Sequence, residues 1–159
     1  MPRSLQKTAI IARTPAEVLA WTGHWPNLRK WMGDSLVGID MLSDHGETDP
    51  LCAGMRFRET RQMGKMKAKA VITVEKHELS ADAAEHEAVC DDGCNRLRYN
   101  YRYEPTPDGM CRAIWTARSE PNKWWTKMLD PVTGPFMIKM VNKCEGDHLD
   151  RLKALIEAD

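Results

Sequence analysis

Five side chains in the middle of the chain have the chemistry for moving protons or polarising a carbonyl group. They are Glu59, Arg61, His86, Tyr99 and Tyr101. Histidine exchanges protons near neutral pH, whereas tyrosine and arginine donate hydrogen bonds to oxygen atoms. If the protein is an enzyme, we expect His86 and Tyr101 to act as acid and base, with Tyr99 and Arg61 polarising a carbonyl.

These residue types also have explanations that involve no catalysis. Glu59 and Arg61 share one face of a predicted strand and could form an internal ion pair, because buried charges are tolerated when they are paired. Alternatively, Arg61 orients an anionic or carbonyl end of a ligand while Glu59 fixes Arg61 or moves a proton, or both residues face solvent at the mouth of a cavity. His86 and His148 lie on apolar faces, where a histidine is typical of a hydrogen-bonded core.

The segments that must position these side chains alternate between apolar and polar residues for roughly eighty positions. This period of two residues is typical of β-strands. Asp92 and Gly93 form a two-residue hairpin signal between two of them. We therefore predict an antiparallel meander. Its strands are expected at residues 5–12, 36–42, 54–63, 65–75, 83–91, 94–104 and 110–119.

Two short helices are predicted after the first strand, because Thr14, Pro15 and Glu17 have the spacing of a capping box with proline at the first helical position. The second short helix is expected to end at Gly33. A long amphipathic helix is predicted over residues 135–158. Its apolar arc is expected to contain Met137, Met140, Val141, Cys144, His148, Leu152 and Leu155.

The predicted inner face of the sheet is rich in alanine, and the near end of the long helix offers only flexible or small side chains. A curved sheet cannot approach one helix closely along its whole length, so we expect a cavity between them, with a close-packed core as the alternative. The expected ligand-binding residues are Phe57, Glu59, Arg61, Ala70, His86, Tyr99, Tyr101, Trp115, Met137, Met140 and Cys144.

Composition excludes several classes of function. Basic and acidic residues both total 23, which argues against nucleic acid as a partner, and no segment has the length and apolarity of a membrane span or signal peptide. Five cysteines without an export signal indicate reduced thiols. We expect one cytoplasmic domain over residues 1–159, monomeric or homodimeric, without stable membrane insertion. No metal or other cofactor is expected, since neither Cys144 with His148 nor Cys90 with Cys94 has a partner pair.

Two surface features leave alternatives open. Lysines and arginines on the outer sheet face could form an interaction surface, but Glu85 and Glu87 lie on the strand between them, and cross-strand pairing favours a solvated face. Trp124 and Trp125 are predicted to lie outside a regular strand. They would cover the end of the core, form a lid hinged at Gly134, or touch a membrane, and we favour the lid.

The order of elements and a set of local motifs resemble the START or Bet v 1-like (SRPBCC) superfamily, and within it the bacterial polyketide cyclase/dehydrase-like proteins. The motifs are Ala12-Arg13-Thr14-Pro15-Ala16-Glu17-Val18, Trp25-Pro26 with Trp31, Gly54-Met55-Arg56-Phe57, Val71-Ile72-Thr73-Val74-Glu75, Tyr103-Glu104-Pro105 with Gly109, and Leu149-Asp150-Arg151-Leu152-Lys153. They mark a fold and cover nearly the whole chain, but none is a catalytic signature.

The resemblance implies an α+β helix-grip fold, with a curved antiparallel sheet of about seven strands wrapped around a long C-terminal helix. It also implies a hydrophobic cavity for a lipid, polyketide, quinone or similar molecule. We expect the protein to bind such a ligand. The alternative is a cyclase or dehydrase that uses His86, Tyr101 and Arg61 within the same cavity.

Overall fold

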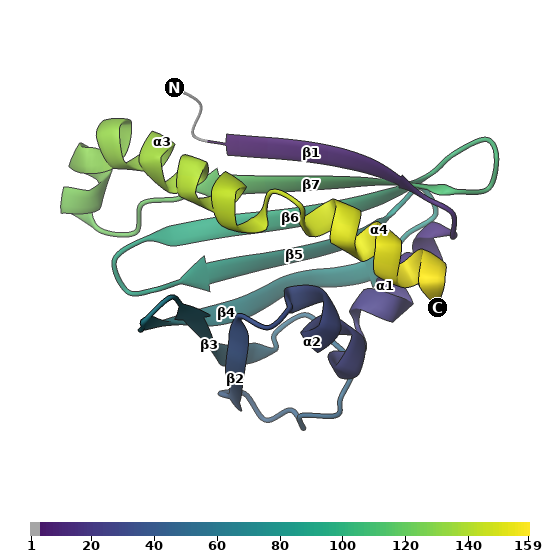
Figure 1. Ribbon diagram of the computed structural model, residues 1–159, viewed down its shortest axis with the longest axis horizontal. Coiled ribbons are helices and arrows are strands. Elements are labelled where there is room, and N and C mark those ends of the chain that lie inside the picture. Colours follow the sequence, from purple (N-terminus) through teal and green to yellow (C-terminus); the bar gives the residue numbers. More distant parts are fainter. Residues whose placement is uncertain (1–3) are drawn as a thin grey trace.

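The computed structural model describes residues 4–159, which form a seven-stranded antiparallel sheet with four helices on its concave side (Figure 1). Residues 1–3, part of the segment searched for a signal peptide, lie outside the described residues. The strands are β1 (Ser4–Ile11), β2 (Leu36–Met41), β3 (Arg56–Met63), β4 (Met66–Leu79), β5 (Ala84–Asp91), β6 (Arg96–Pro105) and β7 (Cys111–Ser119). The helices are α1 (Pro15–Thr22), α2 (Trp25–Met32), α3 (Trp124–Glu145) and α4 (His148–Ala158).

The sheet has the order β1-β7-β6-β5-β4-β3-β2, so consecutive strands from β2 to β7 are neighbours, and β1 closes the far edge beside β7. The meander predicted from the alternation is therefore confirmed. Gly64 and Gly93 have positive φ angles at the hairpins that join β3 to β4 and β5 to β6. The β4 strand continues four residues beyond the predicted end at residue 75, because a β-bulge between Val74 and Lys76 interrupts the alternation there.

The capping box at the start of α1 is formed as predicted. The backbone N–H of Glu17 donates to the Thr14 hydroxyl at 3.3 Å, and the Glu17 carboxylate accepts from the Thr14 backbone N–H at 2.7 Å. Helix α2 ends at Gly33, also as predicted, where φ is +75°. Pro26 lies in the first turn of α2, so it helps to start this helix.

The prediction of one long helix over residues 135–158 is wrong in two respects: where the helix begins, and that it is uninterrupted. Helix α3 begins eleven residues earlier, at Trp124, and includes Pro131 and Pro135 within its length. It stops at Glu145, and α4 begins at His148 after a break at Gly146. A Cβ at Gly146 would overlap the carbonyl oxygen of Asn142, so glycine permits this tight junction. Trp124 and Trp125 therefore belong to a helix, and Gly134 is buried within it.

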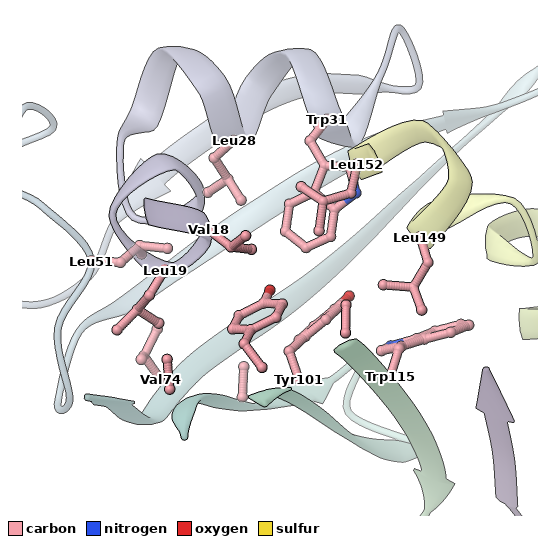
Figure 2. Packing of buried hydrophobic residues seen from close by; sticks show 14 of the residues in the cluster. Val18, Leu19, Leu28, Trp31, Leu51, Val74, Tyr101, Trp115, Leu149 and Leu152 are labelled. Carbon is pink, nitrogen blue, oxygen red and sulfur yellow. The ribbon is translucent and has the colours of Figure 1, made fainter. Parts of the chain in front are cut away.

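The core lies between the concave face of the sheet and the helices, with residues of α1, α2 and α4 and the C-terminal half of α3 (Figure 2). Trp115, Tyr103 and Leu152 are fully buried and come from β7, β6 and α4 respectively. Figure 2 shows Val18 and Leu19 of α1 directed toward the same interior. On the opposite face, Arg98 contacts both Glu75 and Glu87, and further cross-strand ion pairs join Arg102 and Lys76 to Glu85. Arg98 and Arg102 thus pair across strands with Glu87 and Glu85, as predicted. The prediction is wrong for β4, because the lysine that pairs with Glu85 is Lys76, whereas Lys67 and Lys69 lie in the part of β4 that pairs only with β3.

Helix α2 is joined to the α3–α4 junction by two hydrogen bonds that run in opposite directions. The Trp31 indole N–H donates to the carbonyl of His148 at 2.9 Å, and the Arg151 guanidinium donates to the carbonyl of Trp31 at 3.2 Å. Lys7 of β1 donates to the carbonyl of Gly146 at 2.7 Å. The Trp31 carbonyl near the end of α2 and the Gly146 carbonyl just after α3 lie where intrahelical donors are missing. The contacts that satisfy them fix the position of the break relative to α2 and the sheet edge.

Replacement of Trp31 by phenylalanine is expected to lower the free energy of unfolding by about 1–3 kcal/mol, because the buried hydrogen bond from the indole to the carbonyl of His148 is lost while most ring packing remains. Urea denaturation measures this change. The control is Trp21→Phe, which removes an exposed indole hydrogen bond to Asp159 and is expected to cost about 0.5 kcal/mol or less. Equal losses in the two variants would contradict the importance of the Trp31 bond.

Candidate functional site

A pocket of about 70 Å³ lies where α2 and the α3–α4 junction cover strands β3 to β6. Most of its wall is apolar, with several ionisable side chains among the lining residues. The lining consists of Leu28, Trp31, Met32, Leu51, Phe57, Glu59, Arg61, Ile72, Val74, His86, Ala88, Tyr99, Tyr101, Glu145 and His148. Helix α4 packs against β1 and α2, and α3 packs against β7 and β1. The two helices therefore pack mainly at the β1 edge of the sheet, and the pocket lies over strands β3 to β6.

An ion pair forms part of the pocket wall on β3. The Arg61 Nε donates to Glu59 Oε1 at 3.0 Å, and Arg61 Nη1 donates to the Ser35 hydroxyl at 3.3 Å. Burial alone would lower the pKa of Arg61, but the neighbouring Glu59 and Glu145 carboxylates outweigh it and raise this pKa. Arg61 is therefore held as a cation, and its charge is partly balanced inside the protein.

The second carboxylate oxygen of Glu59 is buried and accepts no hydrogen bond from residues 4–159. The residue is only 6% exposed and lies on the pocket wall, so this oxygen has an unused hydrogen-bonding capacity at a desolvated position. Glu145, the last residue of α3, also lines the pocket, and burial raises the pKa of its carboxyl group against the opposing effect of Arg61. The pocket thus has an acidic character around one guanidinium group.

A pair of histidines lies on the wall formed by β4 and β5. The Nδ1 atoms of His77 and His86 are 3.0 Å apart, so one ring donates its proton to the other. Burial, together with His77, lowers the pKa of His86 to about 3, and burial also lowers the pKa of His77. Both rings are consequently neutral at pH 7, and His86 presents a neutral imidazole to the pocket.

His148 begins α4 and is enclosed by aromatic rings. Its ring stacks on Trp115 at a centroid distance of 5.9 Å and lies edge-on to Trp31 at 4.4 Å. Burial lowers the pKa of His148 to about 3, and the positive charges of Arg61 and Arg151 act in the same direction. His148 is therefore a neutral, mainly structural part of the pocket roof.

The structure brings six of the predicted ligand-binding residues together in the pocket wall: Phe57, Glu59, Arg61, His86, Tyr99 and Tyr101. Trp115 is buried behind the wall, stacked on Tyr99 and Tyr101. Ala70, Met137 and Met140 are partly exposed and do not line the pocket, and neither does Cys144, which is exposed. Whether the six wall residues bind a ligand stays a prediction.

The sequence pattern does not assign several pocket residues to the site. Trp31 and Met32 are predicted only as apolar positions of α2, and no pattern indicates a role for Glu145. His77, which contacts His86 but does not itself line the pocket, escapes prediction because the β-bulge turns it to the inner face, opposite His86. One signal for His77 is available: strict alternation would place Lys76 inside the core, which is unfavourable for an unpaired cation.

Comparison with known proteins adds a family to this geometry. The sequence model of the family "Polyketide cyclase / dehydrase and lipid transport" matches residues 2–157. The chain belongs to this family. No curated protein sequence matches this chain.

Solved structures share the fold at low sequence identity. TTHA0849 from Thermus thermophilus is 14% identical with a TM-score of 0.64, covering 98% of this chain and 97% of that chain. Ara h 8.0201 is 10% identical with a TM-score of 0.68, covering 98% of both chains. Norcoclaurine synthase from Thalictrum flavum, in complex with dopamine and hydroxybenzaldehyde, is 12% identical with a TM-score of 0.61, covering 98% of this chain and 86% of that chain. The expected Bet v 1-like helix-grip fold is confirmed.

The low pKa of His148 predicts a specific loss of stability in acid. In the unfolded chain this pKa returns toward its ordinary value of 6.5, so between pH 6.5 and about 3 the unfolded state binds a proton that the folded state does not. The stabilisation is complete above pH 6.5 and is lost as the pH falls, by about 1.4 kcal/mol per pH unit for one proton.

Urea denaturation of the wild type and of His148→Phe between pH 7 and pH 4 measures this effect. The variant is expected to have the shallower decline in the free energy of unfolding, because the phenyl ring keeps the stacking but binds no proton. His24→Phe, at an exposed histidine, is the control and is expected to leave the slope unchanged. Identical slopes for wild type and His148→Phe would contradict a buried neutral imidazole.

Proposed function

We propose that the pocket binds a small, mainly hydrophobic ligand and receives a hydrogen-bond donor of that ligand at Glu59. The supporting observation is the buried Oε2 atom of Glu59, a residue of the mostly apolar pocket wall, which has no hydrogen-bond partner among the described residues. A buried carboxylate oxygen of this kind is costly unless it is hydrogen-bonded. A ligand hydroxyl or protonated amine supplies the missing donor, while Phe57, Ile72 and Trp31 contact the apolar part.

The size of the pocket limits what it holds in this conformation. A volume of about 70 Å³ is much smaller than the roughly 300–1,000 Å³ typical of sites that enclose drug-sized molecules. A small phenol-like group or one end of a longer molecule therefore matches the space better than a complete lipid. For a larger ligand, the roof formed by α2 and the α3–α4 junction has to move away from the sheet.

Binding is favoured over acid–base catalysis by the protonation states of the candidate residues. A general base works best with a pKa near the working pH, and a pKa of about 3 makes His86 a weak base at neutral pH. Burial raises the pKa of Tyr101 well above its usual value, so this phenol is a weak acid. In this conformation His86 and Tyr101 are suited to hydrogen-bonding a ligand rather than to exchanging protons with it.

The family supports the proposal at a coarser level, because its description combines polyketide chemistry with lipid transport. Norcoclaurine synthase, which has the same fold, binds dopamine and hydroxybenzaldehyde, two small aromatic molecules. That likeness supports the capacity of the fold to enclose a small aromatic group. Native mass spectrometry of the purified protein, followed by extraction under denaturing conditions, would reveal the chemical class of a retained ligand.

A matched pair of probes tests the role of Glu59. Phenol and toluene have the same number of heavy atoms, but only phenol donates a hydrogen bond. The wild type is expected to bind both, and Glu59→Gln is expected to weaken phenol binding by about tenfold while changing toluene binding little, because a charge-assisted hydrogen bond becomes a neutral one. NMR titration of the pocket resonances measures both affinities.

The matched control is Glu104→Gln, since Glu104 pairs with Arg102 on the outer face of the sheet. It is expected to change neither affinity. If Glu59→Gln weakened phenol and toluene equally, the carboxylate would serve only to hold Arg61 and the wall in place. If the wild type bound neither probe, the proposed ligand site itself would be wrong.

A further inference from the structure

The N-terminal half of α3 has its polar and apolar faces reversed relative to an ordinary surface helix. The side turned toward the protein carries Thr126, Asp130 and Gly134, all of which are buried. Asp130 accepts a hydrogen bond from the Ser119 hydroxyl of β7 at 3.3 Å. The side turned away carries six large apolar side chains, all exposed. They are Trp124, Trp125, Met128, Leu129, Val132 and Phe136, here called the α3 outer face.

These six side chains form one continuous surface. Trp124, Met128, Val132 and Phe136 are spaced four residues apart, and at about 100° per residue all six fall within an arc of about 140°. Trp124, Met128 and Val132 are each more than 70% exposed, which is unusual for neighbouring large apolar residues. The first turns of α3 also project past the end of β7, so this segment is accessible from outside (Figure 1).

The charges around the α3 outer face have one sign. Lys139 and Lys143 fall on the same arc and extend it toward the C-terminal end of the helix, and Lys123 and Lys127 flank its start. Within residues 124–145 the acidic side chains are Asp130, which is buried, and Glu145, which lines the pocket. The protein as a whole has a formal net charge of zero, so this local excess of lysine is not a general property of its surface.

We infer that the α3 outer face docks reversibly onto an anionic lipid bilayer. Tryptophan and phenylalanine enter the boundary between headgroups and acyl chains, and the lysines contact the phosphate groups of anionic lipids. Binding of this kind is peripheral: among residues 4–159 no helix is long and apolar enough to cross a membrane. A second copy of the chain would provide apolar area but no negative charges for the lysines of the same face, so lipid fits both features better.

The same helix connects this surface to the pocket. Glu145 ends α3 and lines the pocket, whereas Trp124 to Phe136 occupy the opposite end. Docking therefore places one wall of the pocket on a helix in direct contact with lipid. The inference does not depend on the proposed ligand site, because the exposed side chains and the lysines lie outside the pocket.

Vesicle flotation tests the inference with phosphatidylcholine vesicles, with and without about 30 mol% phosphatidylglycerol. The wild type is expected to bind the anionic vesicles, with a blue shift in the emission of the exposed Trp124 and Trp125, and to bind neutral vesicles much less. Combined replacement Met128→Ser, Val132→Ser and Phe136→Ser is expected to weaken binding by about tenfold or more, because the buried apolar area is lost. Lys139→Gln with Lys143→Gln is expected to weaken it by about fivefold per lysine.

Met66→Ser is the matched control, since Met66 is as exposed as Met128 but lies in β4. It is expected to bind anionic vesicles like the wild type. Failure of the wild type to bind anionic vesicles, or equal binding by wild type and the triple serine variant, would overturn the inference. So would a concentration-dependent dimer in analytical ultracentrifugation that disappears in the triple variant, because the α3 outer face would then be an interface between copies of the chain.

Discussion

The paired hydrogen bonds between α2 and α4 determine how the helices of this protein lie on its sheet. Trp31 donates to the first residue of α4, and Arg151 of α4 donates back to Trp31. The last carbonyl groups of a helix need donors from outside it, and α4 supplies one to the Trp31 carbonyl near the end of α2. The position of the pocket follows, because its roof consists of α2 together with the residues on either side of that break.

Polar groups inside the pocket are stabilised in two different ways. Glu59 and Arg61 are joined in an ion pair, whereas His86 and His148 are buried without charge. The neutral histidines thus place no charge beside the surrounding aromatic rings. The ion pair leaves Oε2 of Glu59 without a hydrogen bond from the described residues. A ligand bound there as proposed would be selected by hydrogen-bond direction and shape more than by net charge.

Much of the sheet, and the inner position of Glu59, Arg61, His86 and Tyr101, could be predicted because side chains alternate strictly along a strand. The predictions failed where the period is interrupted. A single helix continued through Gly146 would place Cys144 on the same apolar arc as His148 and Leu152. The break at Gly146 separates the face of α3 from that of α4, and Cys144 is exposed. The helical start at Trp124 was missed because Pro131 and Pro135 suggest a loop, although α3 accommodates both. Trp31 and Glu145 reach the pocket through tertiary packing that no local pattern records.

The β-bulge in β4 has a consequence for how the length of this strand can vary. Val74 pairs with Ala88 and Lys76 pairs with Glu87, so Glu75 is the additional residue. A deletion of Glu75 would remove an outer-face carboxylate and restore regular pairing, yet His77 would still face His86. An insertion or deletion elsewhere in β4 would exchange its inner and outer faces. The position of Glu75 is therefore the one in β4 where a one-residue deletion leaves the His77–His86 contact in register.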